Sequence, residues 1–143
     1  MMLRLLAGAA AVFAVCVAVT AFAQEEKKPE APTRRFFEMR TYVANAGKIE
    51  ALHARFRNHT LPLFKKHGME VVGFWTPTSG EDADRTLIYL MAYPSPEARE
   101  ASWKAFRADP DWVKAKAESE KDGVLVGKVI ETFMNPTDYS PIR

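Results

Sequence analysis

The stretch MEVVGFWT at residues 69–76, followed by TLIYLMAY at residues 86–93, decides the fold of this chain. Both segments are predicted β-strands in which the two alternating faces are apolar. In the first segment, Phe74 belongs to one face and Trp75 to the other. A sheet that contains such strands must bury both of its sides. The sequence therefore predicts a sheet with one more apolar face than its own helices are able to cover.

Two further strands and three helical segments complete a predicted β-α-β-β-α-(α)-β order. The predicted strands are residues 36–43, 69–76, 86–93 and 124–134, and the predicted helices are residues 47–67, a segment that begins at Ser95-Pro96 and a short one that begins at Asp109-Pro110. Helices that return to antiparallel strands predict an α+β, ferredoxin-like β-α-β-β-α-β sandwich with its helices on one side. A second copy of the chain is the simplest cover for the other side, so we expect two sheets packed face to face.

The N-terminal segment has the pattern of a secretory signal peptide. Residues 1–23 contain a single charge, Arg4, and end in the small-x-small sequence Ala21-Phe22-Ala23. We expect cleavage after Ala23, a flexible charged linker at residues 24–34 and a folded domain at residues 35–141. The alternative is an uncleaved membrane anchor, because an apolar run of about 19 residues is long enough to span a bilayer. Cleavage predicts a secreted or periplasmic protein that is not held at a membrane.

Charge and cysteine content argue against several classes of function. The sequence has 20 Lys and Arg residues against 18 Asp and Glu, which disfavours a nucleic-acid partner. The only cysteine, Cys16, lies in the predicted signal peptide, so the mature protein would lack a disulfide and a thiol nucleophile. The three histidines, at positions 53, 59 and 67, do not have the spacing of a chelating helix face, and no metal site is expected. GxSxG, GxGxxG and P-loop motifs are absent from the sequence.

The predicted helix at residues 47–67 carries an apolar stripe that includes a histidine. The stripe consists of Ile49, Leu52, Phe56, His59 and Leu63. Pro62 predicts a kink near Thr60, because proline lacks an N–H and disfavours helical geometry in the preceding residue. A buried His59 could act as a base or ligate a haem iron. The alternative is a structural histidine whose ring N–H binds a backbone carbonyl near the kink.

A second group of candidates lies on the first strand. Glu38, Arg40 and Tyr42 alternate on one face of it. In a ferredoxin-like sheet the first and last strands are neighbours, so Glu131 is expected near Arg40. A charged pair inside a partly dry barrel could bind an anionic or oxygenated ligand. The alternative is a structural ion pair.

The helix that begins at Ser95-Pro96 supplies a third group. Its predicted packing face consists of Ala98, Ala101, Ala105 and Phe106. Arg99 precedes Trp103 by four residues and could stack on the indole while it pairs with a carboxylate. We interpret Arg99 and Trp103 as a structural cation-π pair.

Three segments of the chain resemble the NIPSNAP family. They are FFEMRTYVANAGKIEALHARFRNHTLPLFKKHGMEVVGFW at residues 36–75, YLMAYPSPEAREASWKAFRADPDW at residues 89–112 and ETFMNPTDYSP at residues 131–141. The resemblance covers nearly the whole expected domain and implies a dimeric α+β barrel, in agreement with the strand faces. It implies no settled biochemical activity. The signal peptide departs from the mitochondrial members of that family and suggests an exported bacterial one.

The function we expect is binding of a small, largely apolar or aromatic molecule beneath the sheet of a homodimer. Tyr42, Trp75, Tyr89 and Tyr93 would supply aromatic walls, and Arg40 or His59 a polar group. No cofactor is needed for this function. One alternative, by analogy with other proteins that share the barrel, is a cofactor-free monooxygenase-like or haem-dependent enzyme. Another is a protein-interaction module without small-molecule chemistry.

Overall fold

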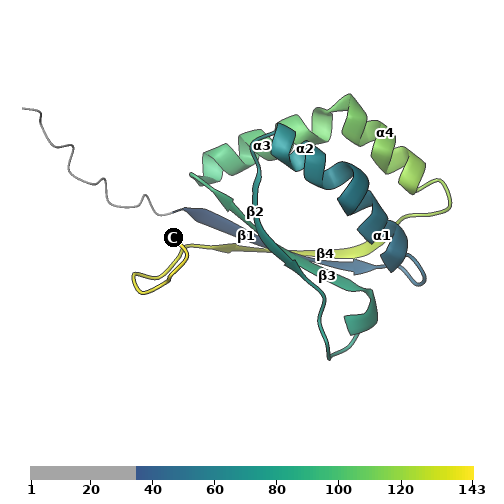
Figure 1. Ribbon diagram of the computed structural model, residues 1–143, viewed down its shortest axis with the longest axis horizontal. Helices are drawn as coiled ribbons and strands as arrows, with labels where there is room; N and C mark the ends of the chain where they lie inside the picture. The colour runs from purple at the N-terminus through teal and green to yellow at the C-terminus, as the bar shows by residue number, and fades with distance from the viewer. Residues whose placement is uncertain (1–34) are drawn as a thin grey trace, which may run out of the picture. The chain divides into compact units, whose positions relative to one another are not determined.

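The computed structural model of the protein describes residues 35–143 (Figure 1). The predicted signal peptide and the predicted linker lie outside the described residues. Within the described part of the chain, no helix has both the length and the apolar character needed to cross a membrane.

The four strands form a single antiparallel sheet in the order β2-β3-β1-β4. They are β1 (Phe36–Ala44), β2 (Glu70–Trp75), β3 (Thr86–Tyr93) and β4 (Val126–Met134). The limits of β3 match the prediction, and those of the other strands differ from it by one or two residues at an end. The first and last strands are neighbours, as predicted, and β4 occupies one edge of the sheet.

The helices of the domain lie on one side of this sheet, as Figure 1 shows. One helical segment consists of α1 (Ile49–Arg55), a π-helix η1 (Phe56–Thr60) and α2 (Leu61–Lys66). A 3₁₀ turn, η2 (Ala83–Arg85), precedes β3, and α3 (Pro96–Ala108) and α4 (Pro110–Ser119) lie between β3 and β4. The α+β class with helices on a single face is therefore confirmed.

The starts of α3 and α4 follow the capping residues in the sequence. Oγ of Ser95 accepts a hydrogen bond from the N–H of Ala98 at 3.2 Å, and Oδ1 of Asp109 accepts one from the N–H of Asp111 at 2.9 Å. The second carboxylate oxygen of Asp109 lies 2.8 Å from Nζ of Lys66 and 2.7 Å from Nε2 of His67. These contacts, first Lys66 and then His67, lower the pKa of Asp109. They also join the end of α2 to the corner between α3 and α4.

The irregularity predicted near Thr60 takes the form of the π-helix. The N–H of Leu61 binds the carbonyl of Phe56, five residues earlier. A π turn uses one residue more than an α turn, so the inward-facing position moves along the chain from His59 to Thr60. Thr60 is only 2% exposed, whereas His59 is exposed. The predicted burial of His59 on the apolar stripe is wrong for this reason.

The buried face of α3 also differs from the predicted one. Arg99, Trp103 and Phe106 are buried, while Ala101 and Ala105 are exposed. The buried residues follow the spacing of one helix face. The large aromatic side chains remove far more apolar surface from water than alanine methyl groups do, and they set the rotation of the helix.

The two faces of the sheet differ in how they are covered. Register pairs Phe74 with Tyr89 and Trp75 with Ile88, and antiparallel partners share a face. Phe74 lies on the helix side, with its ring centroid 5.5 Å from that of Phe56. Trp75, on the other side, is 51% exposed. The helices thus cover one apolar face and leave the second open, as the sequence predicts.

The open face has further apolar members and is only partly covered by residues 35–143. Ile130 of β4 is 44% exposed, and Met39, Ile88 and Leu90 are half-buried. Residues that follow β4 pack against one end of this face and bury Phe37 there. We refer to the remainder of this side of the sheet, which includes Trp75 and Ile130, as the open sheet face.

Candidate functional site

Glu38 is a fully buried carboxylate on β1 that three side chains bind. Arg99 of α3 donates from Nε to Oε2 at 2.9 Å and from Nη2 to Oε1 at 2.7 Å. Nη1 of Arg40 donates to Oε1 at 2.7 Å, and Nε1 of Trp103 donates to Oε2 at 2.7 Å. Each carboxylate oxygen therefore accepts two hydrogen bonds, and the group is satisfied by protein alone.

The protonation state of Glu38 follows from this environment. Burial alone would raise the pKa of its carboxyl. The hydrogen bonds from Arg99, Arg40 and Trp103 outweigh burial and lower the pKa below the usual value. Glu38 is therefore ionised at neutral pH, with all of its hydrogen-bonding positions in use. This arrangement fits the structural alternative better than a role in proton transfer.

Arg40 extends the buried network to β4. It stands opposite Glu131 in the register of β1 and β4, and Nη1 lies 2.5 Å from Oε1 of Glu131. Its guanidinium lies 4.5 Å from the ring centroid of Trp103 and 5.4 Å from that of Tyr42. The guanidinium of Arg99 lies 5.8 Å from the same indole. The structure thus brings together the predicted ion-pair and cation-π residues.

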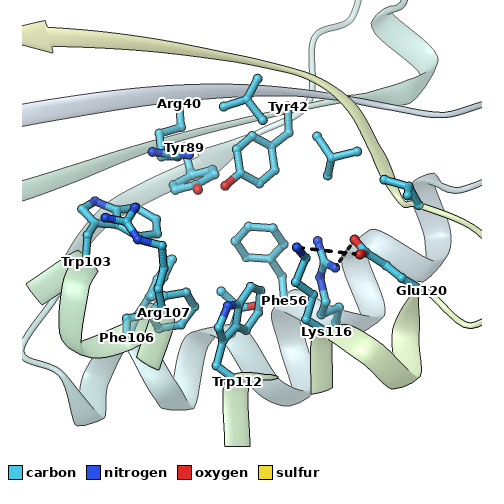
Figure 2. A pocket seen from close by; sticks show the side chains of 16 residues that line it. Arg40, Tyr42, Phe56, Tyr89, Trp103, Phe106, Arg107, Trp112, Lys116 and Glu120 are labelled. Carbon is cyan, nitrogen blue, oxygen red and sulfur yellow. Dashed lines mark hydrogen bonds and ion pairs between the residues drawn. The ribbon is translucent and has the colours of Figure 1, made fainter. Parts of the chain in front are cut away.

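A cavity of about 360 Å³ lies beside this network, between the sheet and the helices (Figure 2). Its volume is within the range of small-molecule sites, about 300–1,000 Å³. The walls are largely aromatic: Tyr42 and Tyr89 come from the sheet, and Phe56, Phe64, Trp103, Phe106 and Trp112 come from the helices. Val124, Val126 and Val129, in and just before β4, complete the lining.

Four buried polar atoms of the cavity lining have no hydrogen-bond partner within residues 35–143. They are Nε of Arg40, Nε of Arg55, Oγ1 of Thr60 and Oη of Tyr89. Every unpartnered buried side-chain nitrogen or oxygen in the described part of the chain belongs to this cavity. An unsatisfied buried polar group costs about 1–3 kcal/mol. Their concentration at one place marks the cavity as a site suited to a polar partner.

The charges that line the cavity are unequal in number. The cationic side chains are Arg40, Arg55, Arg107 and Lys116, and the only carboxylate among the lining residues is Glu120. Nη1 of Arg55 donates to Glu120 at 2.9 Å, and Nζ of Lys116 lies 4.0 Å from that carboxylate. Arg107 is exposed and forms no ion pair with another described residue. The cavity is therefore cationic overall.

The polar groups on the sheet side of the cavity face one corner. In Figure 2, the hydroxyls of Tyr42 and Tyr89 point from the sheet toward the helices, with Arg40 beside them. Burial raises the pKa of Tyr89 well above the usual value, so its hydroxyl is neutral and able to donate. The guanidinium of Arg107 lies 5.7 Å from the ring centroid of Trp103, the same indole that Arg40 contacts. We call these four residues, Arg40, Tyr42, Tyr89 and Arg107, the donor corner.

Of the ligand-binding residues predicted from sequence, Arg40, Tyr42 and Tyr89 line the cavity. His59 does not, because the π-helix turns it outward. Trp75 lines a separate depression near the edge strand β2, beside Phe74. Tyr93 is buried in the core, where its hydroxyl donates to Sδ of Met91 at 3.3 Å. The predicted aromatic walls at Trp75 and Tyr93 are therefore wrong for this cavity.

Sequence reasoning missed most of the residues that line the cavity. Arg55, Thr60, Arg107, Trp112 and Lys116 all line it and were not predicted as site residues. Thr60 required knowledge of the π-helix. The other residues required knowledge of how α1, α3 and α4 pack against the sheet. The only sequence signal was the pairing of aromatic with basic residues in WKAFRADPDWVKAK at residues 103–116. Such spacing is also typical of an ordinary amphipathic surface helix.

Comparison with protein families identifies one match. The family model described as NIPSNAP matches residues 37–141. No curated protein matches the chain.

Several solved structures share the fold. A NIPSNAP family protein of unknown function from Agrobacterium tumefaciens is 24% identical, with a TM-score of 0.68 over 79% of this chain and 97% of that one. An uncharacterized NIPSNAP domain protein from Burkholderia xenovorans is 24% identical, with a TM-score of 0.64 over 74% of this chain and 98% of that one. A second NIPSNAP family protein from Agrobacterium tumefaciens is 19% identical, with a TM-score of 0.67 over 76% of this chain and 99% of that one. At these identities the likeness concerns the fold.

Proposed function

The chain belongs to the NIPSNAP family, and from that premise we propose that it is an exported homodimer that binds a small, largely apolar or aromatic molecule. The site is the cavity between the sheet and the helices. One observation supports the proposal above the others. The cavity has largely aromatic walls, and it also contains every buried polar side-chain atom of residues 35–143 that lacks a hydrogen-bond partner. Apolar walls with a few polar groups that fix orientation are typical of small-molecule sites.

The dimer part of the proposal rests on the open sheet face. The strand order β2-β3-β1-β4, with helices on one side, supports a ferredoxin-like arrangement. Trp75 and Ile130 expose large apolar surface on the side without helices. Large apolar side chains exposed in this way are unfavourable in water and are typical of an interface. A second copy presents the same face, and two such sheets packed together would form the dimeric α+β barrel.

Export is the part of the proposal that rests on residues 1–34 alone. The small-x-small sequence before Gln24 supports cleavage after Ala23. Intact-mass analysis of exported protein should find Gln24 at the N-terminus. Recovery of uncleaved protein from a membrane fraction would instead support the anchor alternative.

The enzyme alternatives have less support from the site. Haem binding through His59 does not fit, because this residue is exposed and outside the cavity. His67 is engaged with Asp109. A cofactor-free monooxygenase would need a group that moves a proton. Glu38 is a poor base, because its pKa is lowered and both of its oxygens are fully hydrogen-bonded, and it does not line the cavity. Binding without chemistry is the function that the site favours.

A neutral fluorescent probe tests the proposed function. We expect N-phenyl-1-naphthylamine to bind saturably, with one site per chain. Val129→Trp places a large side chain in the cavity lining and should weaken this binding at least about tenfold, or about 1.4 kcal/mol. Val113→Trp is the matched control, because Val113 is exposed on α4 and does not line the cavity. Absence of saturable binding, or equal effects of the two variants, would contradict the proposal.

A further inference from the structure

We propose that the ligand of the cavity is an aromatic carboxylate whose carboxylate binds in the donor corner formed by Arg40, Tyr42, Tyr89 and Arg107. This inference rests on the proposed function, because it specifies the chemical class of the ligand at the same site. The evidence for it is the set of polar groups in the donor corner and the aromatic side chains that surround them.

The first argument is the kind of hydrogen-bonding group that the corner offers. Nε of Arg40 is a donor only, and it has no partner among the described residues. Oη of Tyr89 is also unpartnered, and it is able to donate. Both side chains are at least nine-tenths buried and belong to neighbouring strands, where they stand opposite each other in the register. A group that accepts several hydrogen bonds satisfies both atoms, and a carboxylate does so with its two oxygens.

The second argument is charge. The charge of Arg40 is already offset by Glu38 and Glu131. Arg107 has no carboxylate within ion-pair distance in residues 35–143, yet it approaches the same indole as Arg40. An anion in the donor corner would therefore gain an ion pair with Arg107 that a neutral ligand does not.

The third argument concerns the remainder of the ligand. Phe56 and Trp112 face the space next to the donor corner, as Figure 2 shows. Phe56 makes edge contacts with Tyr42 and Tyr89, at centroid distances of 6.1 Å and 5.3 Å. A flat ring attached to the carboxylate would extend this set of edge and stacked contacts. An extended aliphatic acid would match these walls less well.

Two pairs of probes test this inference: trans-cinnamate with trans-cinnamamide, and 2-naphthoate with 2-naphthamide. Each amide has nearly the shape of its acid but no charge. We expect each acid to bind the wild-type protein at least about tenfold more tightly than its amide at neutral pH, as measured by titration calorimetry.

Variants in the donor corner should remove this preference. Arg107→Gln should weaken binding of the acids about tenfold and leave the amides nearly unchanged. Lys104→Gln is its control, because Lys104 is exposed on the same helix and does not line the cavity. Tyr89→Phe should also weaken binding of the acids without lowering the melting temperature, because the deleted hydroxyl has no partner among the described residues. Tyr93→Phe on the same strand should leave the affinity unchanged, because Tyr93 does not line the cavity.

The outcomes separate this inference from the proposed function. If the acids and amides bind equally, or if Arg107→Gln and Tyr89→Phe leave the affinity of the acids unchanged, the inference is overturned. If no probe of either pair binds while N-phenyl-1-naphthylamine still does, the inference fails and the proposed function stands. If N-phenyl-1-naphthylamine does not bind either, both fail, and the cavity is a solvent-filled space.

Discussion

Nε1 of Trp103 donates a hydrogen bond of 2.7 Å to Oε2 of Glu38, and this contact fixes the middle of α3 against the central strand β1. The carboxylate also binds two guanidinium groups, so its charge is compensated without solvent. One wall of the cavity, the Trp103 indole, is therefore positioned by a buried charge. Stability of the fold and geometry of the site depend on the same residue.

The first prediction concerns removal of that charge. Glu38→Gln keeps the size of the side chain but leaves Arg40 and Arg99 with one fewer counter-charge in the interior. We expect a loss of about 3–5 kcal/mol in the free energy of unfolding, measured with urea at a fixed protein concentration. Glu100→Gln is the matched control, because Glu100 pairs with the same Arg99 but its side chain is 67% exposed. The control should change the free energy of unfolding by less than about 1 kcal/mol. Similar losses in the two variants would contradict the buried network.

The second prediction is the pH dependence of the difference in unfolding free energy between the wild type and Glu38→Gln. Because the pKa of Glu38 is lowered in the folded protein, the folded state binds this proton less tightly than the unfolded state does. The stabilisation is therefore complete above the ordinary pKa of 4.5 and is lost as the pH falls through the lower folded pKa. We expect the gap in unfolding free energy between wild type and Glu38→Gln to shrink below about pH 4.5. Asp109 titrates in both proteins and cancels in the comparison. If the unfolding free energies of the two proteins stay parallel as the pH falls, Glu38 is not the group whose protonation removes the stabilisation.

The sheet and its charged network were predictable because strands obey a two-residue period. Alternation places Glu38 and Arg40 on the same face of β1, and the adjacency of β1 and β4 brings Glu131 to Arg40. Both arguments depend on backbone geometry that the apolar pattern specifies. Register is determined here by the charged side chains of β1, since a shift by one residue would move Glu38 and Arg40 from the helix side to the open sheet face.

The helical side of the site was harder to predict because small changes in helix rotation decide which residues face inward. The π-helix places Thr60, and not His59, on the inward face. Burial of the large Trp103 and Phe106 side chains sets the rotation of α3 and leaves Ala101 exposed. Pro62 indicates an irregularity near Thr60 but not its kind, and the rotation of α3 has no distinguishing pattern in the sequence. The donor corner also needs Arg107, whose place depends on how α3 packs against the sheet.

The third prediction tests the rotation that the π-helix imposes. The same substitution is made at adjacent positions, His59→Lys and Thr60→Lys. The first should change the free energy of unfolding by no more than about 0.5 kcal/mol, because His59 is exposed. The second buries an ammonium group among the cationic side chains of the cavity and should cost at least about 2 kcal/mol more. Chemical denaturation measures both. A larger cost at His59 would indicate a regular α-helix in solution.

The last prediction addresses the open sheet face as the dimer interface. Trp75 and Phe74 are adjacent on β2 but lie on opposite faces, so a charge at each position should have a different result. Phe74→Glu places a carboxylate in the core beneath the helices and should abolish folding, seen as loss of the cooperative urea transition. Trp75→Glu places it on the open sheet face, where it should weaken dimerisation at least about a hundredfold in sedimentation equilibrium. The melting temperature of this variant should then rise with protein concentration, because folding and association are linked.

Val113→Glu is the control, since Val113 is 55% exposed on α4, on the helix side, and its substitution should leave the dimer intact. A wild-type protein that sediments as a stable monomer, or a Trp75→Glu dimer as tight as the wild type, would show that the open sheet face does not hold the two copies together.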